Sequence, residues 1–453
     1  MRLREGQAPQ LYGSEASEAE QVEAFRRGDV PVAVYGLGKM GLPLAAVYAD
    51  VTGHTVGVDI DPERAATVAR GENPFPGEPG LGELLDDLVD SDAFKTTTDA
   101  VRAAEYASVH VVMVPTGLRG DRTVDLMSLK EALGHIGAGL DAGDMVVIES
   151  TVPPGTCDGL AMPVLSGQSG LSPDQFGLAY CPERTSSGRA LTDIQGAYPK
   201  VVGGVDTEST RVARLTYGEL TDNEVLAVSD ATTAECVKLF EGVYRDVNIA
   251  LANELATLRD DLEVDVIEAI ETANTQPFCD IHTPGAGVGG HCIPNYPYFV
   301  MKSVGGPTPL LSSAREINDG MPLFVVEKLT QLLTELDTAV RDATVLVLGV
   351  TYRPGVPETS NSPALPISDR LSDLGATVYA ADPVTTDAPE LSATPVDLAE
   401  VYSLDLDGVV LVTAHDAFAD IDWSQFDPLA MVDGRQALQV DEGRHHVYTV
   451  GEG

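Results

Sequence analysis

Short apolar runs separated by helical patterns dominate the chain from Pro31 to about residue 222. Strands of a parallel sheet are covered on both faces, so they appear as nearly continuous apolar runs rather than alternating ones. This alternation of strand and helix predicts an α/β domain with a parallel sheet. The expected strands are Val32–Tyr35, Val56–Asp59, Val109–Val114, Met145–Glu149 and Val201–Gly203.

The pattern becomes purely helical at Ser229. The stretch from Ser229 to about Leu262 contains no proline, and Ser229 is a suitable N-cap for a helix. A loop rich in glycine and proline follows at 283–297, and further helix is expected to about Asp337. A helical region therefore separates the first α/β segment from the rest of the chain.

A second α/β segment begins with the apolar run Thr344–Val350. Its further strands are expected at Val378–Ala380, Val409–Val412 and Met431–Asp433. The outline is thus α/β, helical and α/β, and a length of 453 residues suggests about three domains. Residues 1–30 precede this pattern as an acidic extension, with a helix expected near Glu15–Arg27.

Acidic residues outnumber basic ones by 70 to 28, which gives a formal net charge of −42. Such a field repels nucleic acid and anionic membranes, so neither is expected as a partner. The acid is spread along a chain with 43% hydrophobic residues, which predicts a folded protein with a highly hydrated surface. This composition favours a cytoplasm rich in salt, because salt screens self-repulsion, and it predicts unfolding at low salt but not in molar KCl.

The chain has five cysteines and no CxxC pair. Neither a disulfide framework nor a structural zinc site is expected, and we predict no metal site. Cys157, Cys181, Cys236 and Cys279 are expected to be small buried hydrophobic residues. No apolar run is long enough to span a membrane, and the first residues lack the apolar core of an export signal, so we expect a cytoplasmic protein.

The first candidate site is the sequence GLGKMG, which begins directly after the first strand and opens a helix. Its glycines, Gly36, Gly38 and Gly41, allow a tight turn and a close approach of the backbone to a pyrophosphate. The second strand ends at Asp59, at about the distance where an acid binds the ribose hydroxyls and repels a 2′-phosphate. The pattern favours NAD over NADP; the alternative is a glycine turn without a ligand.

The second candidate site is a cysteine at the end of the glycine-rich sequence GAGVGGHC. Glycines let backbone amides approach a ligand closely, and a cysteine on such a loop is more exposed than one in a core. A thiolate at Cys292 would be a nucleophile, and a buried packing role is the alternative. For His291 we expect a structural hydrogen bond.

The third candidate site lies on the long helix, where Lys238, Gly242 and Arg245 have the spacing of one helical face. Glycine inside a helix costs about 1 kcal/mol relative to alanine, which indicates close packing at Gly242. Burial near a cysteine would lower the pKa of Lys238 into a range useful for acid–base catalysis. The alternative is a solvated cationic face paired with Glu241 or Asp246.

These motifs occur together in a recognisable order. The segments GLGKMGLPLA, VPTG, ESTVPPGT, AYCPER, KLFEGVYRDVNIALANELA, GAGVGGHCIPNYPYF and LGVTYRPGVPETSNSPA together resemble the UDP-sugar 6-dehydrogenases. The resemblance runs from about Pro31 to the C-terminus. The GGHC form with AYCPER is similar to the branch that acts on UDP-N-acetylhexosamines, above all UDP-N-acetyl-mannosamine.

The resemblance implies a four-electron oxidation of a sugar C6 alcohol, first to an aldehyde and then to a uronate. Cys292 matches the family nucleophile, which holds the aldehyde as a thiohemiacetal and then as a thioester. Lys238 matches an acid–base or oxyanion-stabilising lysine. Glu183 and Thr151 match residues that hold the hydrolytic water, although from the residues alone they would be a surface glutamate in a loop and a cap-like threonine.

The resemblance also implies the binding residues. For NAD, besides the three glycines, it carries over to Lys39, Met40, Asp59, Arg64, Thr116 and Thr151. For the UDP-sugar it carries over to Arg184, Thr185, Lys238, Arg245, Gly289, Tyr352, Arg353 and, more weakly, Arg435.

Five positions depart from the family pattern. Gly242 stands where the family has asparagine, and Tyr296 where it usually has aspartate, which concerns oxyanion and water handling. Gln276 and Phe278 replace a histidine and an arginine that contact the sugar and the partner subunit. Ser360 replaces an arginine that contacts the cofactor. The expected fold is nevertheless α/β, with two Rossmann-like doubly wound domains joined by a central helical domain that contains a long helix.

The expected domains are the acidic extension at 1–30, an NAD-binding domain at 31–222, a helical domain at 223–338 with the cysteine loop, and a UDP-sugar-binding domain at 339–453. The resemblance implies a homodimer through the central helices. Three alternatives stay open: a UDP-glucose 6-dehydrogenase, a two-electron β-hydroxyacid dehydrogenase, and a non-catalytic homologue that binds nucleotide sugars.

Overall fold

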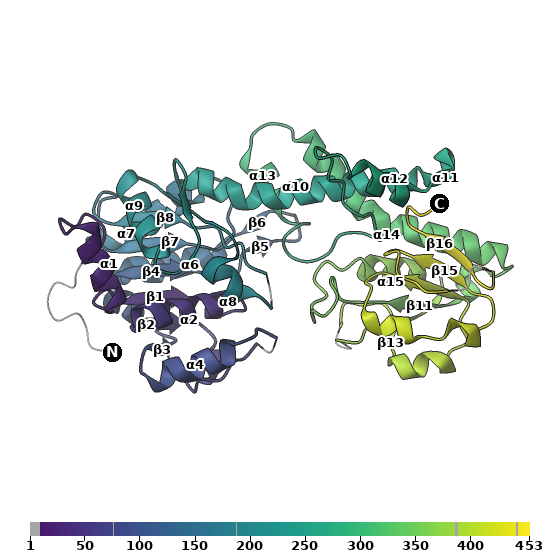
Figure 1. Ribbon diagram of the computed structural model, residues 1–453, viewed down its shortest axis with the longest axis horizontal. Coiled ribbons are helices and arrows are strands. Elements are labelled where there is room, and N and C mark those ends of the chain that lie inside the picture. The colour runs from purple at the N-terminus through teal and green to yellow at the C-terminus, as the bar shows by residue number, and fades with distance from the viewer. Residues whose placement is uncertain (1–9, 76, 187, 386–387, 441–442) are drawn as a thin grey trace. The chain divides into compact units, whose positions relative to one another are not determined.

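The computed structural model describes residues 10–75, 77–186, 188–385, 388–440 and 443–453 (Figure 1). The chain divides into two compact units. Unit 1 comprises residues 1–240 and 298–303, and unit 2 comprises residues 241–297 and 304–453.

Unit 1 is built on an eight-stranded sheet in the order β10-β9-β8-β7-β4-β1-β2-β3. All neighbouring strands are parallel except β8 and β9, which are antiparallel. The strands are β1 (Val32–Tyr35), β2 (Thr55–Val58), β3 (Phe94–Thr97), β4 (Val109–Val112), β7 (Met145–Ile148), β8 (Gly177–Tyr180), β9 (Lys200–Gly204) and β10 (Val225–Ala227). The five predicted strands are confirmed, whereas β3, β8 and β10 were not predicted.

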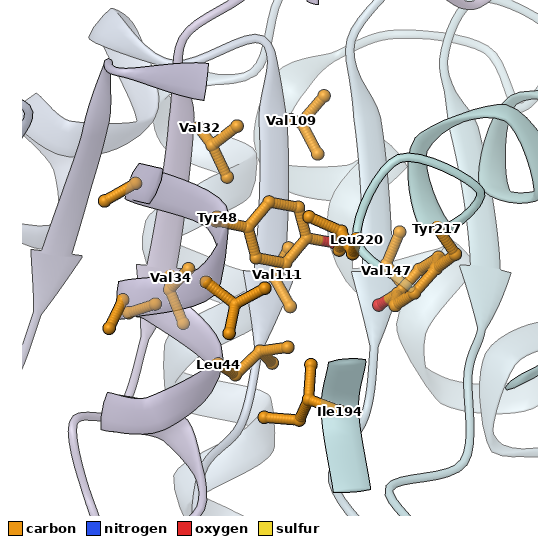
Figure 2. Close-up of a cluster of buried hydrophobic side chains, with 14 of the residues drawn as sticks. Val32, Val34, Leu44, Tyr48, Val109, Val111, Val147, Ile194, Tyr217 and Leu220 are labelled. Carbon is orange, nitrogen blue, oxygen red and sulfur yellow. The ribbon is translucent and has the colours of Figure 1, made fainter. Parts of the chain in front are cut away.

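Helices cover both faces of this sheet. They are α2 (Gly41–Thr52), α3 (Pro62–Val68), α4 (Leu81–Asp90), α5 (Ala100–Tyr106), α6 (Met127–Gly139), α7 (Met162–Ser169), α8 (Ala190–Thr192) and α9 (Thr207–Tyr217). Side chains of β1 alternate between the two cores: Val32 and Val34 enter one cluster, Ala33 and Tyr35 the other. Figure 2 shows the first cluster, where Tyr48 of α2 and Tyr217 of α9 lie beside the sheet valines.

The described part of the acidic extension belongs to unit 1. Helix α1 (Glu18–Arg26) begins at a capping box formed by Ser17 and Glu20, slightly inside the predicted bounds. Phe25 and Leu11 are fully buried in the same core as β1, and the Tyr12 hydroxyl donates to Asp206 over 2.9 Å. The extension is therefore a packed layer of the domain and not only a charged surface segment.

The long helix α10 (Ala231–Thr257) begins in unit 1 and ends in unit 2, and a separate turn, α11 (Arg259–Leu262), follows it. The predicted helix is confirmed, but its N-cap is Asp230 and not Ser229. The Asp230 carboxylate accepts the Thr233 N–H over 2.7 Å, while the Ser229 hydroxyl bonds to the side chains of Asp230 and Thr233. Serine and aspartate are equally good caps, so the sequence alone did not separate them.

Unit 2 contains a six-stranded, fully parallel sheet in the order β13-β12-β11-β14-β15-β16. Its strands are β11 (Thr344–Leu348), β12 (Thr377–Ala381), β13 (Thr394–Pro395), β14 (Gly408–Leu411), β15 (Ala430–Asp433) and β16 (His446–Thr449). The helices are α12 (Val266–Ala273), α13 (Tyr296–Ser303), α14 (Pro309–Glu335) and α15 (Ala364–Asp373), of which α13 continues into unit 1. The predicted fold class, two Rossmann-like doubly wound sheets with a helical region between them in sequence, is confirmed.

Among the described helices, none combines the length and apolar character that crossing a bilayer requires. In the same part of the chain, no three His, Cys, Asp or Glu side chains gather as metal ligands would.

Candidate functional site

The GLGKMG turn lies between β1 and α2, at the carboxyl end of the sheet. Gly36 has φ +98°, and a Cβ there would overlap the Met113 carbonyl oxygen; a Cβ at Gly41 would overlap the Gly36 carbonyl. A Cβ at Gly38 would meet nothing within 4 Å. The first and third glycines are thus required by the packing of the turn, and the middle one borders open space.

Asp59 directly follows β2 and faces this turn. Its carboxylate is 5% exposed and accepts the Leu37 N–H over 2.8 Å. The Arg64 guanidinium lies 3.0 and 3.1 Å from the two carboxylate oxygens. An acid held against the turn, with open space at Gly38, is what a dinucleotide requires, so these residues fit NAD. Lys39 is exposed and Met40 half-buried beside them.

Thr116 and Thr151 lie together at the ends of β4 and β7. The Thr116 hydroxyl donates to the Thr151 carbonyl over 2.6 Å. Next to them the Ser150 hydroxyl accepts the Val114 N–H and donates to the Val114 carbonyl, both over 2.8 Å. These hydrogen bonds connect the segments that follow two neighbouring strands, at the carboxyl end of the sheet, where ligands of such folds bind. Ser150 was not among the predicted residues; its position between Glu149 and Thr151 was the only indication.

Lys238 and Glu183 form an ion pair inside unit 1. The Lys238 Nζ lies 3.2 Å from Glu183 Oε2 and also donates to the Glu183 carbonyl oxygen. The side chains are 8% and 15% exposed. The alternative readings of Lys238 as a solvated cation and Glu183 as a surface glutamate are therefore wrong.

Thr185 connects this pair to the glycine turn. Its hydroxyl and its N–H both donate to Glu183 Oε1, and the hydroxyl also lies 3.1 Å from Met40 Sδ. Burial alone raises the pKa of Glu183, but Lys238 and the Thr185 hydrogen bonds outweigh it, so the pKa lies below its ordinary value. The structure thus brings Met40, Thr185, Glu183 and Lys238 into one cluster.

Arg184, next to this cluster, is held by its own unit. Its Nη1 donates to the Pro199 carbonyl over 2.9 Å, and its guanidinium lies 5.4 Å from the centroid of the Tyr198 ring. The Tyr198 hydroxyl in turn donates to the Arg184 carbonyl. Tyr198 was not predicted as part of this site, and only its place in the aromatic sequence AYPK could have indicated it.

Cys292 lies in unit 2 and is exposed. Its carbonyl accepts the N–H groups of Asn295 and Tyr296 over 3.2 and 3.0 Å, which form a tight turn into α13. Of the other cysteines, Cys157 and Cys181 are buried as expected, but Cys236 and Cys279 are only partly buried, which corrects the prediction for those two. All five are free thiols, so the absence of disulfides among the described residues agrees with the sequence.

The glycines before Cys292 pack against the C-terminal part of unit 2. A Cβ at Gly289 or Gly290 would lie 2.8 or 2.9 Å from Tyr352, and one at Gly287 would lie 3.1 Å from Pro363. Burial raises the pKa of Tyr352, and negative charge at Glu358 and Cys292 adds to the effect. The structure thus brings Gly289, Tyr352 and Cys292 together. The glycines are needed here for close packing against Tyr352, in addition to the close approach to a ligand that the sequence predicted.

His291 makes the expected structural hydrogen bond, with Ser360 as its partner over 2.9 Å. Arg435 serves the same loop: its guanidinium donates to the carbonyls of Val412 and Gly287 over 2.7 and 3.2 Å. Burial lowers the pKa of Arg435. Its contacts within the chain are thus those of a loop anchor. Arg245 and Arg353 are exposed on α10 and after β11.

A buried polar network that was not predicted supports the start of this loop. The Gly285 N–H donates to Asn253, Asn253 donates to Asn318, and Asn318 donates to Asp246, over 2.8 to 2.9 Å. Arg315 pairs with Asp246. Asp246 and Asn253 are two helical turns apart, as polar residues on one face of a helix would be, and this spacing could have indicated the network.

Three domain profiles of one family match the chain. They are described as the NAD binding, central and UDP binding domains of the UDP-glucose/GDP-mannose dehydrogenase family, and they match residues 30–221, 232–320 and 346–440. The chain belongs to the UDP-glucose/GDP-mannose dehydrogenase family. The resemblance inferred from the motifs is therefore confirmed, and so is the prediction of an NAD-binding oxidoreductase that acts on nucleotide sugars.

Members of this family with similar sequences or structures differ in the sugar named for them. A UDP-N-acetyl-D-mannosamine dehydrogenase of Pyrococcus horikoshii is 34% identical over 414 residues, which cover 90% of this chain and 96% of the relative. The NDP-N-acetyl-D-galactosaminuronic acid dehydrogenase of Methanosarcina mazei has 28% identity and a TM-score of 0.84, covering 97% and 98% of the two chains. A UDP-glucose dehydrogenase of Pyrobaculum islandicum has 26% identity and a TM-score of 0.82, covering 93% and 98%.

Proposed function

We propose that this dehydrogenase oxidises the C6 alcohol of a UDP-N-acetylhexosamine to the uronate, with NAD as oxidant and a cysteine-bound intermediate. The observation that carries the proposal is the connection of the Lys238–Glu183 pair, through Thr185, to Met40 in the dinucleotide turn. A charged acid–base pair connected to a dinucleotide site is the equipment that hydride removal from an alcohol requires.

Lys238 acts as the acid–base or oxyanion-stabilising group at C6. The C6 hydroxyl gives its proton to water as the hydride leaves, and the Lys238 ammonium stabilises the oxygen that carries the developing charge. NAD, when bound, accepts a hydride in each of the two oxidations. Charge develops on the C6 oxygen in both oxidations, so the same group can serve both steps.

Cys292 is the nucleophile. Its thiolate adds to the C6 aldehyde and forms a thiohemiacetal, and loss of a second hydride converts this adduct into a thioester. Water held by Glu183 and Thr151 then attacks the thioester carbon, and the C–S bond breaks to release the carboxylate and the thiolate. Two hydrides and three protons leave per alcohol and water consumed, so the overall reaction balances.

The dinucleotide site holds NAD through residues that lie around one edge of the sheet. Asp59 accepts the ribose hydroxyls and repels a 2′-phosphate, which favours NAD over NADP. We assign to this site Gly36, Gly38, Lys39, Met40, Gly41, Asp59, Arg64, Thr116 and Thr151.

The UDP-sugar is assigned to the residues that the family resemblance indicated. A tyrosine and a guanidinium suit a uracil or a diphosphate, through stacking and forked hydrogen bonds. We assign Arg184, Thr185, Lys238, Arg245, Gly289, Tyr352, Arg353 and Arg435 to the substrate. Because Arg184 and Arg435 are already bonded to carbonyls of the chain, they must exchange or share these bonds to reach a substrate.

UDP-N-acetyl-mannosamine is the preferred substrate in this proposal, and the similarity to the Pyrococcus horikoshii enzyme along nearly the whole chain supports it. UDP-glucose is the alternative, supported by the likeness to the Pyrobaculum islandicum structure. The test compares kcat/KM for UDP-N-acetyl-mannosamine, UDP-N-acetyl-glucosamine and UDP-glucose in molar KCl. A preference for UDP-glucose would keep the mechanism and replace the sugar; tight binding without turnover of any of the three would favour a non-catalytic homologue.

We further propose a homodimer that forms through α10. Phe240, Tyr244 and Leu251 of α10 and Leu258 directly after it are 39–57% exposed and recur at spacings of four and seven residues, as the seam of a helix pair does. A net charge of −42 supports activity in a salt-rich cytoplasm, because screening relieves repulsion within and between the subunits.

A further inference from the structure

Gly242 forms a notch in α10 that the side chain of Tyr296 fills. A Cβ at Gly242 would overlap Cδ2 of the Tyr296 ring, and it would lie 3.1 Å from Cγ and 3.2 Å from Cβ of that residue. Tyr296 is 8% exposed. Glycine is unfavourable inside a helix, so a glycine retained there has a packing reason, and the ring supplies it.

The same tyrosine is bound to the turn that carries the exposed thiol. The Tyr296 N–H donates to the Cys292 carbonyl over 3.0 Å, and the Asn295 N–H donates to the same oxygen over 3.2 Å. The Cys292 backbone is therefore one hydrogen bond away from a residue whose ring is fixed in the notch. Displacing the ring is expected to displace this turn, because two hydrogen bonds to one carbonyl close the five residues from Cys292 to Tyr296.

We propose that Tyr296 is a positioning residue, which orients the Cys292 thiol by seating its ring in the Gly242 notch. This inference rests on the proposed function only for the chemical role of the thiol; the position of the Cys292 turn comes from the structure. Of the five departures from the family pattern, Tyr296 lies closest to Cys292 in sequence, and Gly242 is the one on the helix that carries Lys238. Their contact makes them one coupled change, a small residue on one side and a large one on the other.

The test uses Gly242→Ala in the full-length protein, with Gly320→Ala as the matched control. Gly320 also lies inside a long helix, α14, but a Cβ there would meet nothing within 4 Å. The readouts are the rate at which iodoacetamide alkylates Cys292, measured on the peptide that contains it, together with kcat, KM and the melting temperature. Peptide-level detection separates Cys292 from the partly buried Cys236 and Cys279.

Gly242→Ala is expected to change the Cys292 alkylation rate and to lower kcat by about ten- to a hundred-fold, because misplacement of a reacting group by about 1 Å has effects of this size. KM for NAD stays unchanged, and Gly320→Ala changes neither the alkylation rate nor kcat. Wild-type alkylation and kcat in folded Gly242→Ala would overturn the proposal.

Tyr296 variants keep the test open if Gly242→Ala fails to fold, because they introduce no overlap. Tyr296→Phe retains the ring and is expected to keep more of the wild-type alkylation rate and kcat than Tyr296→Ala, which removes the ring from the notch. In Tyr296→Ala the substitution Gly242→Ala adds no further loss, since the overlap is gone. A Tyr296→Phe protein as impaired as Tyr296→Ala would contradict a role for the ring. Alkylation needs no turnover, so it decides the proposal even if the assigned reaction fails.

Discussion

The Lys238 ammonium and the Glu183 carboxylate lie 3.2 Å apart, and both side chains are largely buried in unit 1. The pair comes from a loop after β8 and from the long helix, 55 positions apart in the sequence. Removing one partner of such a pair leaves an uncompensated buried charge, which costs far more than the intact pair contributes.

Lys238→Met is therefore expected to lower the free energy of unfolding by about 3 to 5 kcal/mol at neutral pH. In the wild type the pKa of Glu183 is lowered, so its stabilising contribution is present above the ordinary value of 4.5 and is lost as pH falls through the lowered pKa. Without Lys238, burial dominates and raises the pKa of Glu183, so the variant loses stability as pH rises from 4.5 towards neutrality. Denaturant unfolding of both proteins across this pH range measures the opposite slopes.

The control for this prediction is Lys95→Met. Lys95 pairs with Asp92 over 2.7 Å, but the two side chains are 50% and 78% exposed. An exposed pair contributes about 0 to 1 kcal/mol, so this variant should unfold almost as the wild type does. Equal losses in the two variants would mean that the burial of Lys238 carries no energetic weight.

The three glycines of the dinucleotide turn are expected to respond differently to alanine. Gly36→Ala should destabilise the protein by at least about 1 kcal/mol, because Gly36 has a left-handed backbone and its Cβ would overlap the Met113 carbonyl. Gly38→Ala should leave the melting temperature unchanged but weaken NAD binding by about ten-fold or more, since its Cβ enters the open space assigned to the pyrophosphate. Thermal unfolding and NAD titration of both variants separate the effects; unweakened NAD binding by Gly38→Ala would place the pyrophosphate elsewhere.

The N-terminal layer is expected to matter for stability. Phe25 is fully buried in the core beside β1, so Phe25→Ala should cost about 3 to 5 kcal/mol in the free energy of unfolding. Glu15→Ala, a change on the same segment ahead of the helix, should fall within about 0.5 kcal/mol of the wild type. Urea unfolding measures both. A small effect of Phe25→Ala would show that the segment packs only loosely on unit 1.

The apolar patterns predicted most of the fold because buried parallel strands appear in the sequence as continuous apolar runs. Strands β1, β4 and β7 are fully buried apolar runs, whereas β3 has the sequence FKTT at the sheet edge, where only Phe94 is buried and the pattern disappears. A three-residue strand such as β10 is too short to show any period.

The candidate site was only partly accessible from the sequence. The glycine turn and Asp59 follow from local spacing, because a strand, a turn and a helix fix their positions together. The partner of Lys238 depends on tertiary structure, and local patterns offered Glu241 and Asp246 instead of Glu183. Asp246 is in fact committed to Arg315. Long-range pairing of this kind became visible only in the structure.

The exposed apolar stripe formed by Phe240, Tyr244, Leu251 and Leu258 predicts a dimer that a single charged substitution in the stripe disrupts. Leu251 is 45% exposed, and Leu251→Asp should convert a dimer into a monomer because it places a charge in an apolar seam. Met127→Asp is the control, since Met127 is 59% exposed on α6 and lies outside the stripe. Light scattering in molar KCl gives the masses. A wild-type monomer, or a Leu251→Asp dimer, would exclude this seam as the interface.

The central claim is a four-electron oxidation carried by Cys292, and the NADH yield per limiting UDP-N-acetyl-mannosamine tests it most directly. We expect two NADH per sugar in the wild type and a loss of uronate formation in Cys292→Ala, with Cys279→Ala, which alters another thiol of unit 2, unchanged from the wild type. One NADH per sugar in the wild type, or two in Cys292→Ala, would contradict the cysteine-bound second oxidation.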